Sequence, residues 1–430
     1  MVVACLAELR KRMSNPESQT WYSDLVAIAD SLCDQWRELR RQLHQHPELS
    51  GQEFETTQRL AAVLDGIGIA PQVIGAGSSI ELANGRNAEG RGLIADFVSS
   101  PECAHRKKFA IRGDIDALPI SDSKAVSYRS QVDGVMHACG HDVHASVVVG
   151  AMQILHQMHL SGKLPWDVAV RAIFQPAEEI AQGARYMIAH DVMHEVESVL
   201  ALHVDPTRAV GKIGLLDGPF TAACDIFEVR FSGKGGHGAR PHLSHDAIDA
   251  ASAWVQAVYR CVPRVVNPHE TIVISIGQME AGHSANVIPD EAVLRGSLRS
   301  LDADSRLVAL SKINAIGDSI FQQTGCEVAY STIMSAPAVI NDKHLVERLG
   351  YVAERVIDPA AVEEIAQPSM GSEDFSFYLQ QHAGAMYRLG VAGPQIGHEP
   401  LHTPNFDVDE RAIAIGAKLM AAMAIDHFAA

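Results

Sequence analysis

Apolar and polar positions along the chain follow two periods, and their order predicts the architecture. A period near 3.6 residues predicts helices, and short apolar runs between turn residues predict strands. Strands are expected at 92–98, 108–114, 167–175, 198–204 and 385–391, and helices at 22–46, 53–64, 143–160, 177–190, 342–356 and from 409 onward. Strands that alternate with helices indicate an α/β fold in which helices flank a mixed central sheet.

A different pattern occupies the middle of the chain. Elements in the order strand, helix, strand, strand, helix, strand are expected at 223–233, 246–262, 271–279, 291–300, 302–324 and 326–333. This βαββαβ order is the ferredoxin-like split βαβ arrangement. We therefore predict a discontinuous catalytic domain, residues 1–217 and 335–430, into which a lid and dimerisation domain of residues 218–334 is inserted.

Composition and charge limit the possible partners. The chain has 430 residues, of which 47% are hydrophobic and 20% charged, and this is typical of a globular protein with two domains. The net charge of −17 argues against nucleic acid and anionic membranes as partners, because both attract basic surfaces. No apolar run reaches the roughly 18 residues that predict a transmembrane helix.

Cysteine usage and the start of the chain indicate the compartment. The seven cysteines are odd in number and scattered, which is typical of a reduced cytosolic chain. Residues 1–12 (MVVACLAELRKR) are apolar first and basic only afterwards, the reverse of a secretory signal. We therefore expect a cytoplasmic protein.

The densest group of reactive side chains lies in residues 136–144 (MHACGHDVH). Cys139 and His141 could bind a metal, because thiolate and imidazole suit zinc and similar ions. A buried cysteine beside a helix-capping histidine is an alternative interpretation. A third is a reactive cysteine, because a nearby histidine and a helix N-terminus lower the pKa of a thiol.

Three further segments favour the metal. Glu178 and Glu179 follow the predicted strand 167–175, at the carboxyl end of which an α/β sheet usually binds ligands. Taken alone, both could simply complement a helix dipole. His203 ends an apolar strand, where a core histidine is the alternative, and His402 lies in a loop flanked by prolines. Together the four segments supply Cys, His and Glu at positions suited to ligands.

These segments carry a family resemblance. The matching stretches, in order, are LRRQLHQHPELSGQE (39–53), IRGDIDALPI (111–120), GVMHACGHDVHAS (134–146), FQPAEE (174–179), GKGGHGARPH (233–242), ANVIPDEAVLRGSLR (285–299), MGSEDFSFY (370–378) and LHTPNFDVDE (401–410). The chain resembles the dinuclear-metal aminoacylases and related carboxypeptidases. The most similar branch contains indole-3-acetyl-amino-acid hydrolases, hippurate hydrolases and N-acetyldiaminopimelate deacetylases.

The resemblance implies a role for each candidate residue. Cys139 would bridge two divalent ions (manganese, zinc, cobalt or nickel), His141 and His203 would complete one of them, and Glu179 and His402 the other. Glu178 would be the general base, and Asp116 would orient a metal ligand from behind. In the lid, His237 would polarise the scissile carbonyl, commonly from a partner subunit, and Asn286 and Arg299 would bind the substrate.

Two positions depart from the family pattern. Asp114 stands where other branches have a metal-binding histidine, so His141 is taken as the replacement. Residues 178–184 (EEIAQGA) lack glycines that often follow the paired glutamates. This second departure concerns the shape of the nearby pocket.

The predicted function is metal-dependent hydrolysis of the amide bond of an N-acyl amino acid, by a homodimer joined through the lid. A dipeptidase or carboxypeptidase-like activity at the same metals is the main alternative. A non-catalytic metal-retaining protein would not need Glu178. A thiol-redox enzyme fits least, because no second cysteine lies near Cys139 in the sequence.

Overall fold

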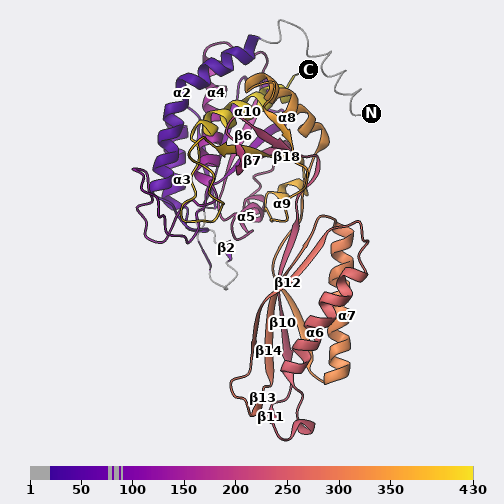
Figure 1. The fold of residues 1–430 in the computed structure, drawn as a ribbon. Coiled ribbons are helices and arrows are strands. Elements are labelled where there is room, and N and C mark those ends of the chain that lie inside the picture. Colours follow the sequence, from indigo (N-terminus) through magenta and orange to yellow (C-terminus); the bar gives the residue numbers. More distant parts are fainter. Residues whose placement is uncertain (1–19, 76–79, 82–86, 89–90, 430) are drawn as a thin grey trace. The chain divides into compact units, whose positions relative to one another are not determined.

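The computed structural model describes residues 20–75, 80–81, 87–88 and 91–429 (Figure 1). Residues 1–12, on which the expectation about a secretory signal rests, lie outside the described residues. The chain forms two compact units. Unit 1 contains the described residues up to Gly218, together with Ile340–Ala366 and those from Phe377 onward, and unit 2 contains Pro219–Val339 and Gln367–Ser376.

Unit 1 is built on an eight-stranded mixed sheet. Its order is β1 (Pro71–Ile74), β4 (Gly92–Val98), β6 (Ala169–Gln175), β5 (Lys108–Asp114), β7 (Val196–Ala209), β18 (Ala383–Ala392), β8 (Ile213–Leu215) and β17 (Val362–Glu364). The central strands β6, β5, β7 and β18 are parallel, so their carboxyl ends meet at one edge. A short ribbon pairs β2 (Ile80–Glu81) with β3 (Asn87–Ala88). Another pairs β9 (Gly218–Thr221) with β16 (Val339–Asn341), where the chain passes from unit 1 into unit 2 and back.

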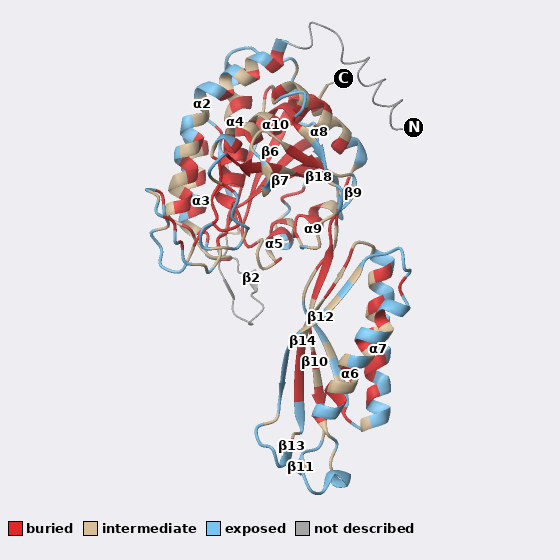
Figure 2. Cartoon of the chain, viewed as in Figure 1, coloured by how far each residue is buried: buried red, intermediate tan, exposed pale blue. Residues whose placement is uncertain are grey.

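Helices cover this sheet. They are α2 (Thr20–Gln45), α3 (Phe54–Gly66), α4 (His141–Leu160), α5 (Gly183–Ala189), α8 (Lys343–Val356), α9 (Ser376–Leu379) and α10 (Arg411–His427). Helices α4 and α10 contact the sheet, and α2 packs against both of them. Helix α4 is apolar on nearly all sides and almost entirely buried, as expected of a helix in the middle of a domain (Figure 2). The predicted α/β fold with a mixed sheet is confirmed.

One helix is shorter than predicted. The expected helix at 177–190 begins only at Gly183, and Glu178 and Glu179 lie in a turn before it. The backbone explains the difference, because Ala177 and Ala181 have φ values of 54° and 52°. This left-handed conformation is incompatible with a continuing α-helix.

Unit 2 has the predicted ferredoxin-like order. Its sheet runs β12 (Ile272–Ala281), β14 (Glu291–Ser300), β10 (Ala223–Ser232) and β15 (Glu327–Ala336), with antiparallel neighbours. Helices α6 (Ala247–Cys261) and α7 (Ala303–Thr324) share one core with the sheet. Strands β11 (Gly236–His237) and β13 (Val287–Ile288) form a small ribbon, and η3 (Pro241–Leu243) and η4 (Val262–Arg264) are short helices, as is η2 (Pro101–Cys103) of unit 1.

Residues 367–376 pack with unit 2 although they follow it in sequence by almost thirty residues. Ala222 N–H donates to the carbonyl of Ser369 (2.9 Å), and Ser369 N–H donates to that of Phe220 (3.0 Å). The Arg299 guanidinium donates to the carbonyl of Met370 (2.6 Å). None of the helices in the described part of the chain has the length and apolar character that a membrane span requires.

Candidate metal centre

Two strands and one helix of unit 1 bring predicted site residues to the carboxyl edge of the parallel strands. Strand β6 leads into the turn with Glu178 and Glu179, and β7 carries His203. Helix α4 begins at His141, after Gly140 in a left-handed conformation (φ 83°). A side chain at Gly140 would also collide with Val204, so glycine is required where the chain enters α4.

Cys139 is shared by two groups of possible ligands. With His141 and His203 it forms a fully buried group whose ligand atoms all lie within 4.8 Å of one another. With Glu179 and His402 it forms a second group of the same size. Its Sγ lies 3.4 Å from His203 Nε2 and 3.3 Å from His402 Nε2. The five residues predicted as ligands are therefore brought together around one sulfur atom.

Two polar atoms between these groups are left without a hydrogen-bond partner. His141 Nε2 and Glu179 Oε1 are both buried, and neither makes a hydrogen bond within the described residues. They lie 3.8 Å apart. Because burying an unpaired polar atom is costly, such atoms call for an explanation. Thiolate, imidazole and carboxylate are the donors that zinc and related divalent ions prefer, so these residues fit a metal centre.

The pKa values of three groups at the centre, Cys139, Glu179 and His203, point the same way. Burial and the nearby Glu179 carboxylate hold the pKa of the Cys139 thiol well above its ordinary value. Burial also raises the pKa of Glu179 to about 7, and burial with the nearby Arg388 holds the pKa of His203 well below its usual range. A neutral imidazole is ready to bind a cation, and a crowded acid and thiol would be ionised by one.

Asp116 fixes the orientation of His141. Its Oδ1 accepts the His141 Nδ1–H (3.0 Å), and its Oδ2 accepts Ser50 Oγ–H (2.7 Å) and Glu179 N–H (3.0 Å). Since Nδ1 carries the hydrogen, His141 presents the lone pair of Nε2 to the centre. Asp116 thus contacts His141 without belonging to either group that shares Cys139.

The turn before Glu178 is held by a residue for which the sequence predicted no role. Glu53 is fully buried, and its Oε1 accepts the N–H groups of Ala177 (2.8 Å) and Gly51 (2.9 Å). Glu53 and Ser50 both lie in the family-like segment 39–53, but Ala177 and Asp116, which they contact, lie more than sixty residues away along the chain. Only the folded structure reveals these contacts.

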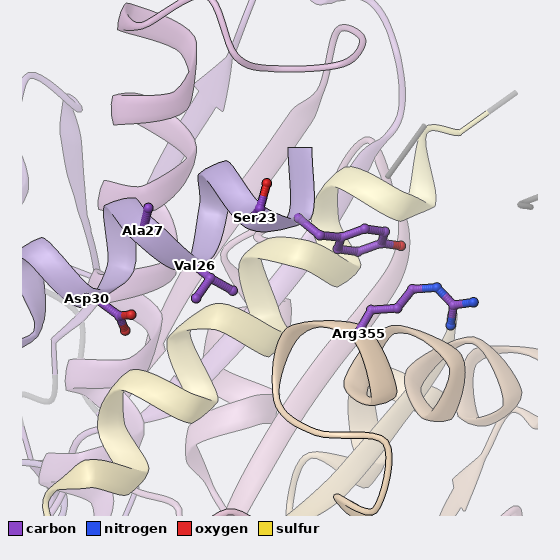
Figure 3. Close-up of a pocket in the computed structure, with 6 residues that line it drawn as sticks. Ser23, Val26, Ala27, Asp30 and Arg355 are labelled. Atoms are coloured by element: carbon purple, nitrogen blue, oxygen red, sulfur yellow. The ribbon is translucent and has the colours of Figure 1, made fainter. Parts of the chain in front are cut away.

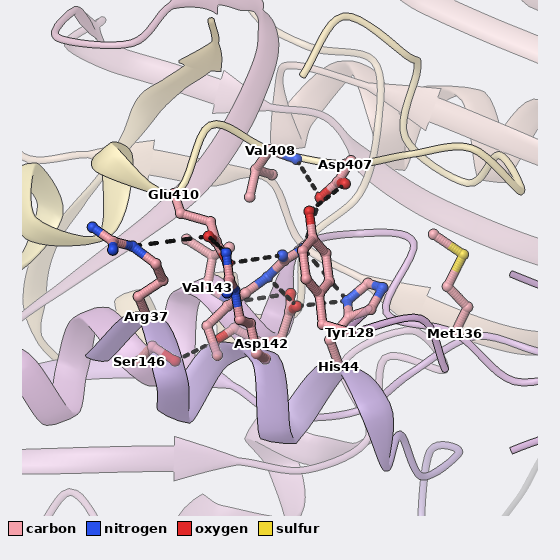
Figure 4. A network of polar contacts seen from close by, with 12 residues as sticks. Arg37, His44, Tyr128, Met136, Asp142, Val143, Ser146, Asp407, Val408 and Glu410 are labelled. Carbon is pink, nitrogen blue, oxygen red and sulfur yellow. Dashed lines mark hydrogen bonds and ion pairs between the residues drawn. The ribbon is translucent and has the colours of Figure 1, made fainter. Parts of the chain in front are cut away.

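A buried ionic network supports the centre from the side of α2 (Figure 4). The guanidinium of Arg40 donates to Asp142 (2.8 Å) at the start of α4 and to Asp407 (3.1 Å), five residues after His402. His44 adds a contact to Asp142 (2.7 Å). The network therefore ties α2 to the segments that carry His141 and His402. A charge as deeply buried as Arg40 requires such pairing.

The loop of His402 is under backbone strain. His402 has φ 61°, which few residues other than glycine adopt, and its N–H donates to the carbonyl of Ala138 (2.8 Å). Strain of this kind is concentrated at functional sites.

The three predicted substrate residues lie in unit 2, at opposite ends of its sheet. His237 and Asn286 line one hollow of about 1030 Å³, and the ribbon pairs His237 with Val287. Roughly 27 Å of strand β14, at about 3.4 Å per residue, separates Glu291 at that end from Arg299 at the other. Unit 2 by itself does not bring all three residues together.

A second cavity, of about 490 Å³, lies at the start of α2 in unit 1 (Figure 3). Ser23, Val26, Ala27 and Asp30 of α2 line it together with Tyr22 and Arg355. None of these six belongs to a candidate metal group among the described residues. The cavity therefore has no part in the chemistry considered below.

Comparison with known proteins places this centre in a family. Residues 110–426 match the model of peptidase family M20/M25/M40. The chain belongs to this family. It is 37% identical over 395 residues to a probable hydrolase of Synechocystis, covering 91% of this chain and 95% of the relative. It is 33% identical over 388 residues to an N-acetylcysteine deacetylase of Bacillus subtilis, covering 90% and 95% of the two chains.

Solved structures of the family agree with the two-unit architecture. A putative aminohydrolase from methicillin-resistant Staphylococcus aureus superposes with a TM-score of 0.84 at 30% identity, over 95% of this chain and all of the other. A dinuclear metal-binding peptidase of the family from Bacillus subtilis superposes with a TM-score of 0.74 at 30% identity, covering 93% and 99%. The predicted family, the enzyme class and the catalytic-plus-lid fold are confirmed, and the chain is a hydrolase.

Proposed function

We propose that the protein is a metal-dependent amidohydrolase that removes the acyl group from N-acyl amino acids. The observation that carries the proposal is the pair of unpartnered buried atoms, His141 Nε2 and Glu179 Oε1, around the shared thiol of Cys139. Two divalent ions would satisfy these atoms, one held by Cys139 with His141 and His203, the other by Cys139 with Glu179 and His402. Such ions activate water and polarise carbonyl groups.

Glu178 is the residue best placed to move protons. Its carboxylate lies within 4.8 Å of ligand atoms of His141 and Glu179, in the turn where β6 ends. Glu178 would accept a proton from the attacking water and pass it to the departing amide nitrogen. Glu53 would support this step indirectly, because it anchors the backbone N–H of Ala177.

Named relatives guide the choice of substrate. Two relatives from Bacillus subtilis, 33% and 35% identical, are named N-acetylcysteine deacetylases, and a third, 34% identical, is named a putative amidohydrolase. A carboxypeptidase of Saccharolobus solfataricus is 33% identical over 90% of this chain. We therefore place N-acyl amino acids first and keep small peptides as the second candidate.

The split arrangement of unit 2 supports a homodimer. A small substrate cannot contact both His237 and Arg299 of the same chain if these lie at opposite ends of β14. In a dimer joined along the edge strand β12, the His237 that reaches a given site could belong to the other subunit. Ala239 N–H donates to His237 Nδ1 (3.1 Å), so Nε2 carries the hydrogen and could donate it to a carbonyl oxygen.

The cysteines bear on the location of the protein. Six described cysteines are free, and this agrees with a reducing compartment such as the cytoplasm.

The test is a substrate panel. Purified protein supplied with manganese, cobalt or zinc would be assayed on N-acetyl, N-benzoyl and indole-acyl amino acids and on dipeptides, with Glu178→Gln as the control. We expect hydrolysis of at least one N-acyl amino acid and much slower hydrolysis of dipeptides. Hydrolysis of dipeptides alone would favour the carboxypeptidase-like function, and hydrolysis of neither class would contradict both.

A further inference from the structure

A chain of buried hydrogen bonds runs beneath the metal centre and crosses four elements. It joins Gln175 at the end of β6, Arg112 and Asp114 on β5, His144 in the first turn of α4, and the backbone of Val204 on β7. The guanidinium of Arg112 donates to Gln175 Oε1 (2.9 Å) and to Asp114 Oδ2. Asp114 Oδ1 lies 2.6 Å from His144 Nδ1, and Val204 N–H donates to His144 Nε2 (3.0 Å). All four side chains are fully buried.

The backbone contact determines the tautomer of His144. Because Val204 N–H is a donor, His144 Nε2 must accept with its lone pair, and the ring hydrogen must reside on Nδ1. Nδ1–H then donates to Asp114, whose other oxygen accepts from Arg112. Both ring nitrogens of His144 are therefore engaged. Although His144 lies close enough to His141 and Asp114 to be grouped with them as possible ligands, its geometry does not leave a lone pair for an ion.

The chain ends beside a proposed ligand. Val204 follows His203, and the carbonyl of Val204 accepts the His203 Nδ1–H (2.8 Å), which leaves His203 Nε2 facing Cys139. The rings of His144 and His203 lie 5.0 Å apart. His144 thus holds the N–H group of Val204, and the carbonyl group of the same residue orients the His203 ring. A shift of this backbone would turn the His203 ring away from Cys139.

We propose that Arg112, Asp114 and His144 form a positioning relay that holds His203 in place as a ligand of one of the two ions. This inference rests on the proposed function, and it gives the relay no direct contact with substrate. Arg112 fixes the orientation of the Asp114 carboxylate, Asp114 holds the His144 ring by accepting its Nδ1–H, and His144 fixes the Val204 backbone. Loss of the relay should weaken the binding of one ion and leave the affinity for the other unchanged.

Two substitutions of His144 separate hydrogen bonding from ring shape. Phenylalanine keeps a ring of similar size but has neither donor nor acceptor. Glutamine loses the ring, but its amide offers one donor to Asp114 and one acceptor to Val204 N–H. If the hydrogen bonds of His144 are what hold His203 in place, His144→Gln should restore the metal affinity that His144→Phe loses. If His144 were itself a ligand, His144→Gln should not restore the affinity, because an amide binds such ions poorly in place of imidazole.

The experiment loads metal-free protein with cobalt and measures the number of ions, their affinities and the visible absorption spectrum. We expect two ions per chain for the wild type. For His144→Phe we expect one ion unchanged and the other weakened by about 10–100-fold, as is typical when an outer partner of a ligand is lost. The spectrum should change with the weakened ion, and His144→Gln should recover both the affinity and the spectrum.

A matched control excludes general destabilisation. Asn341 is buried in unit 1, accepts Met386 N–H (2.8 Å) and donates to the carbonyl of Leu216 (2.9 Å), outside the relay. We expect Asn341→Leu to melt at a lower temperature than the wild type but to bind both cobalt ions normally. Circular dichroism would confirm that each variant is folded before titration.

The outcomes are distinguishable. If folded His144→Phe binds both ions as the wild type does, or if His144→Gln is as defective as His144→Phe, the relay is wrong. If the wild type itself binds no cobalt, the proposed function fails and the relay with it. If His144→Phe does not fold, Asp114→Asn replaces it. The amide of the new asparagine puts a donor against Arg112 or against His144 Nδ1–H, so this variant should also bind one ion more weakly. Unchanged binding of both ions would overturn the relay.

Discussion

Cys139 Sγ lies 3.3 Å from His402 Nε2, although 263 residues separate the two in the chain. The contact is made possible by the hydrogen bond from His402 N–H to the carbonyl of Ala138, which fixes the His402 loop beside the cysteine. A sulfur atom between two histidines and a glutamate is suited to being shared by two cations.

Cys139 should act as a metal ligand and not as a nucleophile. A nucleophilic cysteine needs a lowered pKa, whereas burial and Glu179 raise that of Cys139 in the metal-free protein. Mass spectrometry during a single turnover of a slow substrate should therefore show no acyl-enzyme, and Cys139→Ala should lose bound metal. Detection of a thioester on Cys139 would place the protein in a different mechanistic class.

The two adjacent glutamates should have different roles. Glu179 Oε1 lies among the proposed ligands, 3.5 Å from His402 Nε2, so Glu179→Gln should reduce metal content. Glu178→Gln should retain both ions and lose about 10²–10⁴-fold in turnover, the usual contribution of a proton-transfer group. Elemental analysis beside kinetics checks this. Equal loss of metal from both variants would show that the roles are wrongly divided.

Glu53 should make the metal-free protein less stable as the pH rises. Burial and the nearby Asp116 raise the pKa of Glu53 from 4.5 to about 8 in the folded state. Between these two values the unfolded chain releases the proton and the folded chain keeps it, so the free energy of unfolding falls as pH increases and the loss is complete above pH 8. Below pH 4.5 both states are protonated and the effect vanishes.

Glu53→Gln tests this dependence, because glutamine can still accept the N–H groups of Ala177 and Gly51 with its Oε1. Relative to the wild type, we expect the variant to gain on the order of a few kcal/mol between pH 5 and pH 9. Chemical denaturation of metal-free protein at both pH values measures the gain. The same difference at both pH values would mean that Glu53 does not titrate in this range.

If the active sites are shared, two inactive variants should complement each other. His237→Ala and Glu178→Gln would be mixed under conditions that exchange subunits. A mixed dimer then contains one site with both residues intact, so activity should partly return. Native mass spectrometry would verify the exchange. Absence of recovery after proven exchange would mean that His237 serves its own chain or has no part in catalysis.

The sequence predicted most of the fold because the buried strands are continuous apolar runs. The strands expected at 92–98 and 108–114 coincide with β4 and β5. The sequence did not predict the late start of α5, since alanine rarely adopts the positive φ found at Ala177 and Ala181. Nor did any pattern indicate that residues 367–376 pack with unit 2, because that depends on hydrogen bonds between distant backbone segments.

For the site, the sequence indicated which residue types gather but not what holds them. Cys139, His203 and His402 were found from motif resemblance, and the structure brings them together. Arg112 and His144 were not assigned a role. Their roles depend on the direction of individual hydrogen bonds. When a charged residue such as Arg112 lies inside an apolar strand, the sequence does not indicate which residue pairs with it.

The central claim is that Cys139 and four side chains around it hold two divalent ions on which amide hydrolysis depends. Its most direct test removes metal exhaustively with a chelator, follows hydrolysis of the best N-acyl amino acid, and then titrates manganese, cobalt or zinc while bound metal is counted. The account predicts that activity disappears and returns as binding approaches two ions per chain. Full activity of the demetallated protein would contradict it.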